Sequence, residues 1–100
     1  MALGVLASAP LAASSYVPLR SAEPAEGFVP TAGVAVQIAR AILVPIYGKG
    51  VIDQEEPLTA TLHGDTWEVT GHLPDGARGG VAIVAIAKQN GAILGVYHGK

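Results

Sequence analysis

The segment LTATLHGDTWEVT, residues 58–70, alternates apolar and polar side chains on both sides of the dipeptide Gly64-Asp65. A period of two is typical of a strand with one buried face, and a two-residue turn that begins with glycine is typical of a type II′ hairpin. This turn sets the register of the hairpin, so that one face is apolar and the other carries threonine and glutamate. The expected cross-strand pairs are His63 with Thr66, Leu62 with Trp67, Thr61 with Glu68, and Ala60 with Val69.

A second hairpin is predicted around Asn90-Gly91, between strands at residues 80–88 and 92–98. Asn-Gly is the dipeptide most typical of a tight hairpin turn. The first of these strands is apolar at every position before Lys88, so both of its faces need cover. The side of this hairpin that a single helix leaves open is expected to carry an exposed apolar patch, made of Val84, Ile86, Ile93 and Tyr97.

A helix is predicted upstream of the hairpins, over residues 32–47, with Thr31 as its N-cap. Its only strongly polar side chains, Gln37 and Arg40, lie three positions apart on one face. Pro45 is expected to bend the last turn. The residues expected to face the core, at helical spacing, are Val34, Ile38, Ala41, Ile42 and Ile46.

Gly48 and Gly50 are expected to end this helix. Residues 48–57 are then expected to form a polar connection. This connection carries three carboxylates, Asp53, Glu55 and Glu56. Adjacent acidic residues in a polar loop are usually solvated, so we interpret them as surface groups rather than as a general acid–base site.

Residues 1–31 are rich in alanine and proline and are predicted to be a leader outside the fold, which leaves 32–100 as the domain. Met1–Ala13 resembles the apolar part of a secretory signal, with small-residue cleavage sites at Ala7-Ser8-Ala9 and Leu11-Ala12-Ala13. This favours a periplasmic or secreted protein over a cytoplasmic one. No membrane span is expected, because Pro10, Ser14 and Ser15 interrupt the apolar run.

Charge and composition exclude several classes of protein. Six Lys and Arg residues against eight Asp and Glu give a formal net charge of −2, and the basic residues are scattered, which disfavours nucleic-acid binding. The chain has no cysteine, and all its serines lie in the leader, so nucleophilic catalysis is not expected. His63 and His72 lie about 20 Å apart along the hairpin, too far to share a zinc ion. We therefore predict no catalytic residue, no metal site and no cofactor.

Four segments in order, ARAILVPIYG (39–48), GDTWEVTGHLP (64–74), GGV (79–81) and the closing HGK (98–100), resemble the NTF2-fold immunity protein family. The resemblance covers about residues 33–100. It implies a short NTF2-like or cystatin-like α+β fold, in which a helix is cradled by a curved antiparallel sheet, and a non-enzymatic protein that neutralises a bacterial toxin by binding it. None of the matching residues is implied to be catalytic.

The predicted fold is therefore α+β, with one N-terminal helix on a four-stranded antiparallel sheet made of two hairpins. One helix covers only one face of such a sheet, so the second hairpin is expected to dock a second copy or another protein. Two alternatives to toxin neutralisation stay open, an exported envelope interaction domain and a small NTF2-like enzyme or ligand carrier. The residues predicted to contact a partner are Asp53, Glu55, Glu56, Val84, Ile86 and Tyr97.

Overall fold

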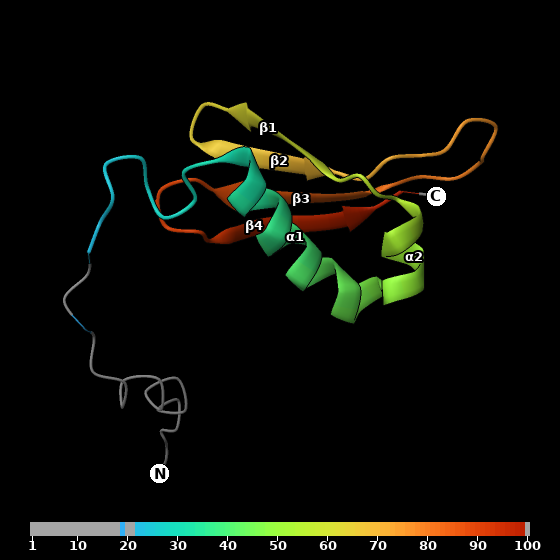
Figure 1. Ribbon diagram of the computed structural model, residues 1–100, viewed down its shortest axis with the longest axis horizontal. Coiled ribbons are helices and arrows are strands. Elements are labelled where there is room, and N and C mark those ends of the chain that lie inside the picture. Colours follow the sequence, from blue (N-terminus) through green and yellow to red (C-terminus); the bar gives the residue numbers. More distant parts are fainter. Residues whose placement is uncertain (1–18, 20–21, 100) are drawn as a thin grey trace, which may run out of the picture.

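The computed structural model describes Leu19 and residues 22–99. Its elements are α1 (Ala32–Tyr47), α2 (Lys49–Gln54), β1 (Thr59–His63), β2 (Thr66–Thr70), β3 (Ala82–Ala87) and β4 (Ile93–His98). The strands form one open antiparallel sheet in the order β1-β2-β3-β4, and α1 lies across one face of it (Figure 1). This arrangement confirms the predicted fold class. Within the described part of the chain, no helix is long and apolar enough to cross a membrane. The signal-like segment Met1–Ala13 lies outside the described residues.

The hairpin of β1 and β2 has the predicted register at all four expected pairs. Gly64 adopts a φ of 61°, as the first position of a type II′ turn requires. Trp67 and Val69 are buried beneath α1, whereas Glu68 between them lies on the opposite face. A local turn and a period of two were therefore sufficient to place this hairpin.

Helix α1 begins where it was predicted, but its buried face is different. Thr31 caps it, and the Thr31 hydroxyl accepts a hydrogen bond from the Val34 N–H at 3.3 Å. The buried residues are Ala35, Ala39 and Leu43, spaced four apart, whereas Ala41 and Ile46 of the predicted set are exposed. Because nearly every position of this helix is apolar, the pattern did not identify which face packs; the small side chains let α1 approach the sheet closely.

A short second helix occupies much of the expected polar connection. Helix α1 runs through Pro45 to Tyr47, and Gly48, with a φ of 98°, ends it while its N–H donates to the Val44 carbonyl at 2.8 Å. Helix α2 follows at once, and its Ile52 is fully buried in the core. The predicted stop at Gly50 is wrong, because Gly50 lies inside α2.

The hairpin of β3 and β4 forms at the predicted place with a wider loop. The Ala87 N–H donates to the Ala92 carbonyl, so four residues are enclosed, and Gly91 alone among them has a positive φ. The strand pairing also shifts between Ala85 and Ile86, which leaves Leu94 as the extra residue of a β-bulge.

The predicted exposed patch is wrong for Val84 and Ile86, which are both fully buried beneath α1. Val84 pairs with Val69, and Ile86 pairs with Trp67. Residues that pair across an antiparallel sheet point to the same face, so the orientation of β2 determines that of β3. Tyr97 pairs with Ile83 and lies on the opposite face, where 63% of it is exposed.

Residues just before α1 also belong to the folded unit, so the boundary predicted at residue 31 is too late. Val29 is buried in the core, its N–H donates to the Lys88 carbonyl, and its own carbonyl accepts from the Trp67 indole at 2.8 Å. Gly27 has a φ of 85°, and a Cβ there would lie 2.5 Å from the Lys88 carbonyl oxygen. This entry segment, Gly27 to Val29, is thus held against the loop between β3 and β4 by backbone hydrogen bonds.

Candidate functional site

One buried carboxylate lies at the junction of α2 with the sheet. Glu55 forms the C-cap of α2, and its side chain is 8% exposed. Its Oε1 accepts a hydrogen bond from the Ala82 N–H at 2.7 Å, and its Oε2 lies 2.6 Å from the His98 Nε2. The Glu55 backbone carbonyl also accepts from the His72 N–H at 2.7 Å. A single residue thus connects the end of α2 to the start of β3, the end of β4 and the segment that follows β2.

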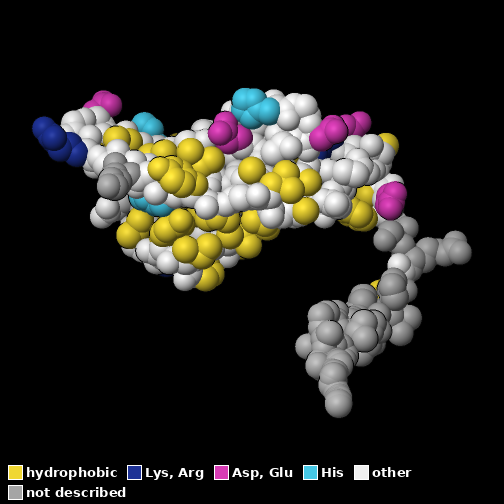
Figure 2. Space-filling view, turned by 180° about the vertical axis from the view of Figure 1, so that it is seen from behind, with side chains coloured by type: hydrophobic (Ala, Val, Ile, Leu, Met, Phe, Trp, Pro, Cys, Tyr) yellow, Lys and Arg dark blue, Asp and Glu magenta, His cyan; other side chains and the backbone are white. Residues whose placement is uncertain are grey.

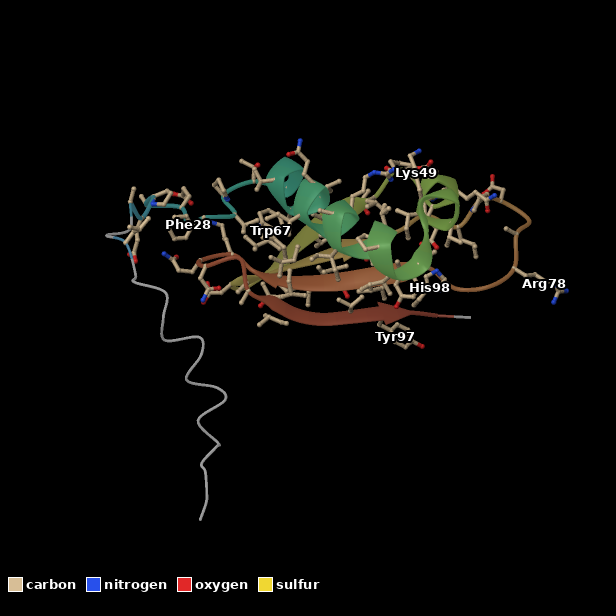
Figure 3. The ribbon with its side chains drawn as sticks, turned by 90° about the horizontal axis from the view of Figure 1, so that it is seen from below. Phe28, Lys49, Trp67, Arg78, Tyr97 and His98 are labelled. Atoms are coloured by element: carbon tan, nitrogen blue, oxygen red, sulfur yellow. The ribbon has the colours of Figure 1, made fainter. Side chains whose placement is uncertain are left out.

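His98 carries the positive charge of this pair. Its Nδ1 lies 2.7 Å from the Gly99 carbonyl oxygen, so both ring nitrogens face acceptors and both must donate. The Glu55 carboxylate, followed by the Gly99 carbonyl, raises the pKa of His98 above its ordinary value. The Tyr47 ring packs on the imidazole with centroids 5.0 Å apart. Figure 3 shows His98 on the helix side of β4, with Tyr97 on the other side.

The backbone leaves little free space around this pair. A Cβ on Gly71 would lie 2.3 Å from Glu55 Oε1 and 3.0 Å from its Cβ, so only glycine fits there. Both carboxylate oxygens are occupied by donors of the same chain, which leaves no free oxygen directed at a substrate. We therefore interpret Glu55, His98 and Gly71 as a structural clamp.

A second charged group lies on the solvent side of the two helices. The Arg40 guanidinium contacts Asp53 at 2.5 Å and Glu56 at 2.7 Å, and Lys49 reaches Asp53 at 2.6 Å. Hydrogen bonds from Lys49 and then Arg40 lower the pKa of Asp53 below its ordinary value. The side chains of Asp53 and Glu56 remain 41% and 39% exposed. These helices therefore present a fixed, mixed-charge surface to solvent.

An open groove adjoins this charged group along the outer side of α1. Its volume is about 470 Å³, and it is lined mainly by apolar atoms. The cations Arg40 and Lys49 stand on its rim and are both held by Asp53. Glu55 is not part of its lining, so the buried carboxylate and the groove are separate features. The lining residues are Gln37, Arg40, Ala41, Val44, Pro45 and Lys49.

The face of the sheet turned away from α1 has no helix or strand covering it in the described part of the chain. Figure 2 shows apolar side chains in patches across it, histidine and acidic side chains on its β1–β2 side, and a basic group at the far end of the molecule. His63 and Glu68 lie 3.1 Å apart on this face. In the residues described, no group of three or more His, Asp or Glu side chains is arranged to hold a metal ion.

The six residues predicted to contact a partner thus separate into two sets. Asp53, Glu56 and Tyr97 are exposed, whereas Glu55, Val84 and Ile86 are buried and offer no surface. The prediction for Glu55 failed because its environment depends on His98, which is 43 positions away in the sequence. In the sequence, Gly71 and His98 are the residues that mark this environment. Neither indicates a buried carboxylate from its sequence neighbours alone, because both contact Glu55 only in the folded chain.

The helix, the open sheet and the fully occupied buried carboxylate define a small α+β domain with broad exposed surfaces. A family model described as "NTF2 fold immunity protein" matches residues 34–100, and the chain belongs to that family. Similar curated proteins include two from Escherichia coli (strain K12). The uncharacterized protein YbbC is 37% identical over 73 residues, which are 72% of this chain and 60% of YbbC. The uncharacterized protein YhhH is 34% identical over 68 residues, which are 67% of this chain and 54% of YhhH.

The chain therefore spans a little more than half of the length of these two relatives. No solved structure matches it.

Proposed function

We propose that this protein neutralises a cognate bacterial toxin by binding to it, without catalysing a reaction. The observation that carries the proposal is the match to the immunity family over residues 34–100, which includes α2, all four strands and all but the first two residues of α1. The matched segment therefore covers nearly the whole folded unit, including most of its core, the Glu55–His98 clamp and the exposed residues Asp53, Glu56 and Tyr97.

The exposed members of the predicted contact set are the proposed contacts with the toxin. Asp53 and Glu56 are held in place by Arg40, so little side-chain entropy remains to be lost when a partner binds them. Both keep free surface with which to accept hydrogen bonds from cationic groups of a partner. Tyr97 is an exposed aromatic residue of the kind enriched at protein interfaces.

The environment of Glu55 supports a binding role over an enzymatic one. An isomerase-like site needs a buried acid directed into an apolar cavity. Glu55 is the buried acid of the described fold, but the Ala82 N–H and His98 occupy its oxygens, and the groove on α1 is elsewhere.

Co-expression tests the proposal. The protein is produced in a bacterium together with the toxin-like protein encoded beside its gene, and growth and direct binding are measured. Rescue of growth by wild type, with less rescue by Asp53→Lys and Glu56→Lys, is expected. Gly33→Ala, on the far end of α1, serves as the matched control and should rescue fully. Unchanged toxicity with wild type, or a neighbouring gene without any toxic product, would refute the proposal.

A further inference from the structure

The outer edge of β4 pairs with no strand within residues 22–99, because β4 ends the sheet order. An edge strand turns every second backbone N–H and C=O outward, where another strand can pair with them. Helix α1 makes its main strand contacts with β1, β2 and β3, and the β4 side chains of Ile93, Leu94 and Tyr97 remain exposed. The six residues of β4 provide an edge about 20 Å long.

The side chains of β4 expose apolar surface along this edge. Ile93, Leu94 and Tyr97 are 39%, 57% and 63% exposed, which is a high density of large apolar surface for one strand. Natural sheets block such edges with charged side chains, with proline or with β-bulges, and of these devices β4 has the single bulge at Leu94. Between Gln89 and Gly99 the sequence has no Lys, Arg, Asp, Glu or Pro.

We infer that β4 pairs with β4 of a second copy of this chain, antiparallel and across a two-fold axis. Antiparallel pairing of identical strands aligns outward donors with outward acceptors, and a two-fold contact uses the same patch on both copies. A charged edge would place like charges opposite each other in such a pair, which is destabilising. β4 has no Lys, Arg, Asp or Glu, and its His98 is paired with Glu55 on the helix side, so this repulsion is avoided and the contact covers Leu94 and Tyr97.

The other edge of the sheet limits the assembly to two copies. The outer edge strand β1 carries Thr59, Thr61 and His63, and it is polar apart from Ala60 and Leu62. Pairing through β4 therefore gives an eight-stranded sheet with a polar strand at each end, a closed assembly that does not continue into a fibre.

The size of the contact determines its strength. A single strand edge about 20 Å long provides a contact at the low end of the range for specific interfaces, below about 1,200 Å² in total. Such a contact forms and breaks reversibly, so the dimer is expected to dissociate within the micromolar concentration range.

Sedimentation equilibrium of the full chain tests the inference. The mass of wild type is expected to rise from 10.1 kDa toward twice that value as the concentration increases from about 2 to about 200 µM. Leu94→Lys should weaken dimerisation by about tenfold or more, because it removes buried apolar area and brings two like charges into the shared contact. Leu62→Lys places the same charge on the opposite edge strand, where Leu62 is 43% exposed, and should change the dimerisation constant by less than about twofold.

Three results would overturn the inference: a wild-type monomer at the highest concentration, equal weakening by both variants, or no weakening by either. Circular dichroism checks that each variant is folded. Because the chain has no cysteine, Tyr97→Cys provides an independent test if Leu94→Lys does not fold. A short bismaleimide should join Tyr97→Cys chains into dimers and leave Leu62→Cys chains monomeric, and the reverse pattern would contradict pairing through β4.

Discussion

Replacing Glu55 with alanine is expected to lower the free energy of unfolding by about 2–4 kcal/mol. The Ala82 N–H loses its acceptor and stays buried, which costs about 1–3 kcal/mol. The charged hydrogen bond to His98 adds about 1 kcal/mol, and no more, because the His98 side chain is 23% exposed and water can take over part of the contact. For a domain of this size the loss corresponds to a decrease in Tm of at least about 8 °C.

Urea unfolding at pH 7, followed by circular dichroism, measures this loss. Glu56→Ala is the matched control, because Glu56 is the neighbouring residue, carries the same charge and is 39% exposed. Its loss should be less than half of that for Glu55→Ala. Equal losses for the two variants, or a loss below about 1 kcal/mol for Glu55→Ala, would show that the buried carboxylate is not the clamp described above.

The raised pKa of His98 means that its pair with Glu55 stabilises the fold fully below pH 6.5, the ordinary value of histidine, and that this stabilisation is lost as the pH rises through the elevated folded-state pKa. The urea midpoint should therefore fall between pH 6 and pH 9, and His98→Gln should flatten that change. Gly71→Ala should be strongly destabilising because its Cβ would overlap Glu55. Gly33→Ala in α1 should stabilise the fold by about 0.5–1 kcal/mol, because a Cβ there meets no close neighbour. A urea midpoint for Gly71→Ala equal to or above that of Gly33→Ala would contradict this packing. Trp67→Phe removes the indole bond to the entry segment and should cost about 1 kcal/mol by the same assay, and a neutral effect would mean that this bond is not needed.

The parts of the fold that depend on short-range signals could be predicted. Gly64 with Asp65 sets a local turn, and the strand period then gives every pair of the first hairpin. Thr31 marks the start of α1 for the same reason, because an N-cap acts on the three residues that follow it.

The parts that depend on distant residues could not be predicted. α1 is apolar almost all round, so only the sheet determines that Ala35 and Ala39 face inward. β3 is apolar on both faces, and its pairing with β2 determines that Val84 is buried. Helix α2 is six residues long, too short to show a period, and the burial of Glu55 at its end needs His98 from the last strand.

The entry segment also restricts how the chain can be processed. A protease that removes the leader and keeps the whole entry segment must cut before Gly27, since cuts further along would remove in turn the hydrogen bonds of Phe28 to Gln89 and of Val29 to Lys88 and Trp67. Cleavage after Ala9 or Ala13 meets that condition with more than ten residues in reserve. Limited proteolysis should accordingly leave a resistant fragment whose first residue lies at or upstream of Gly27.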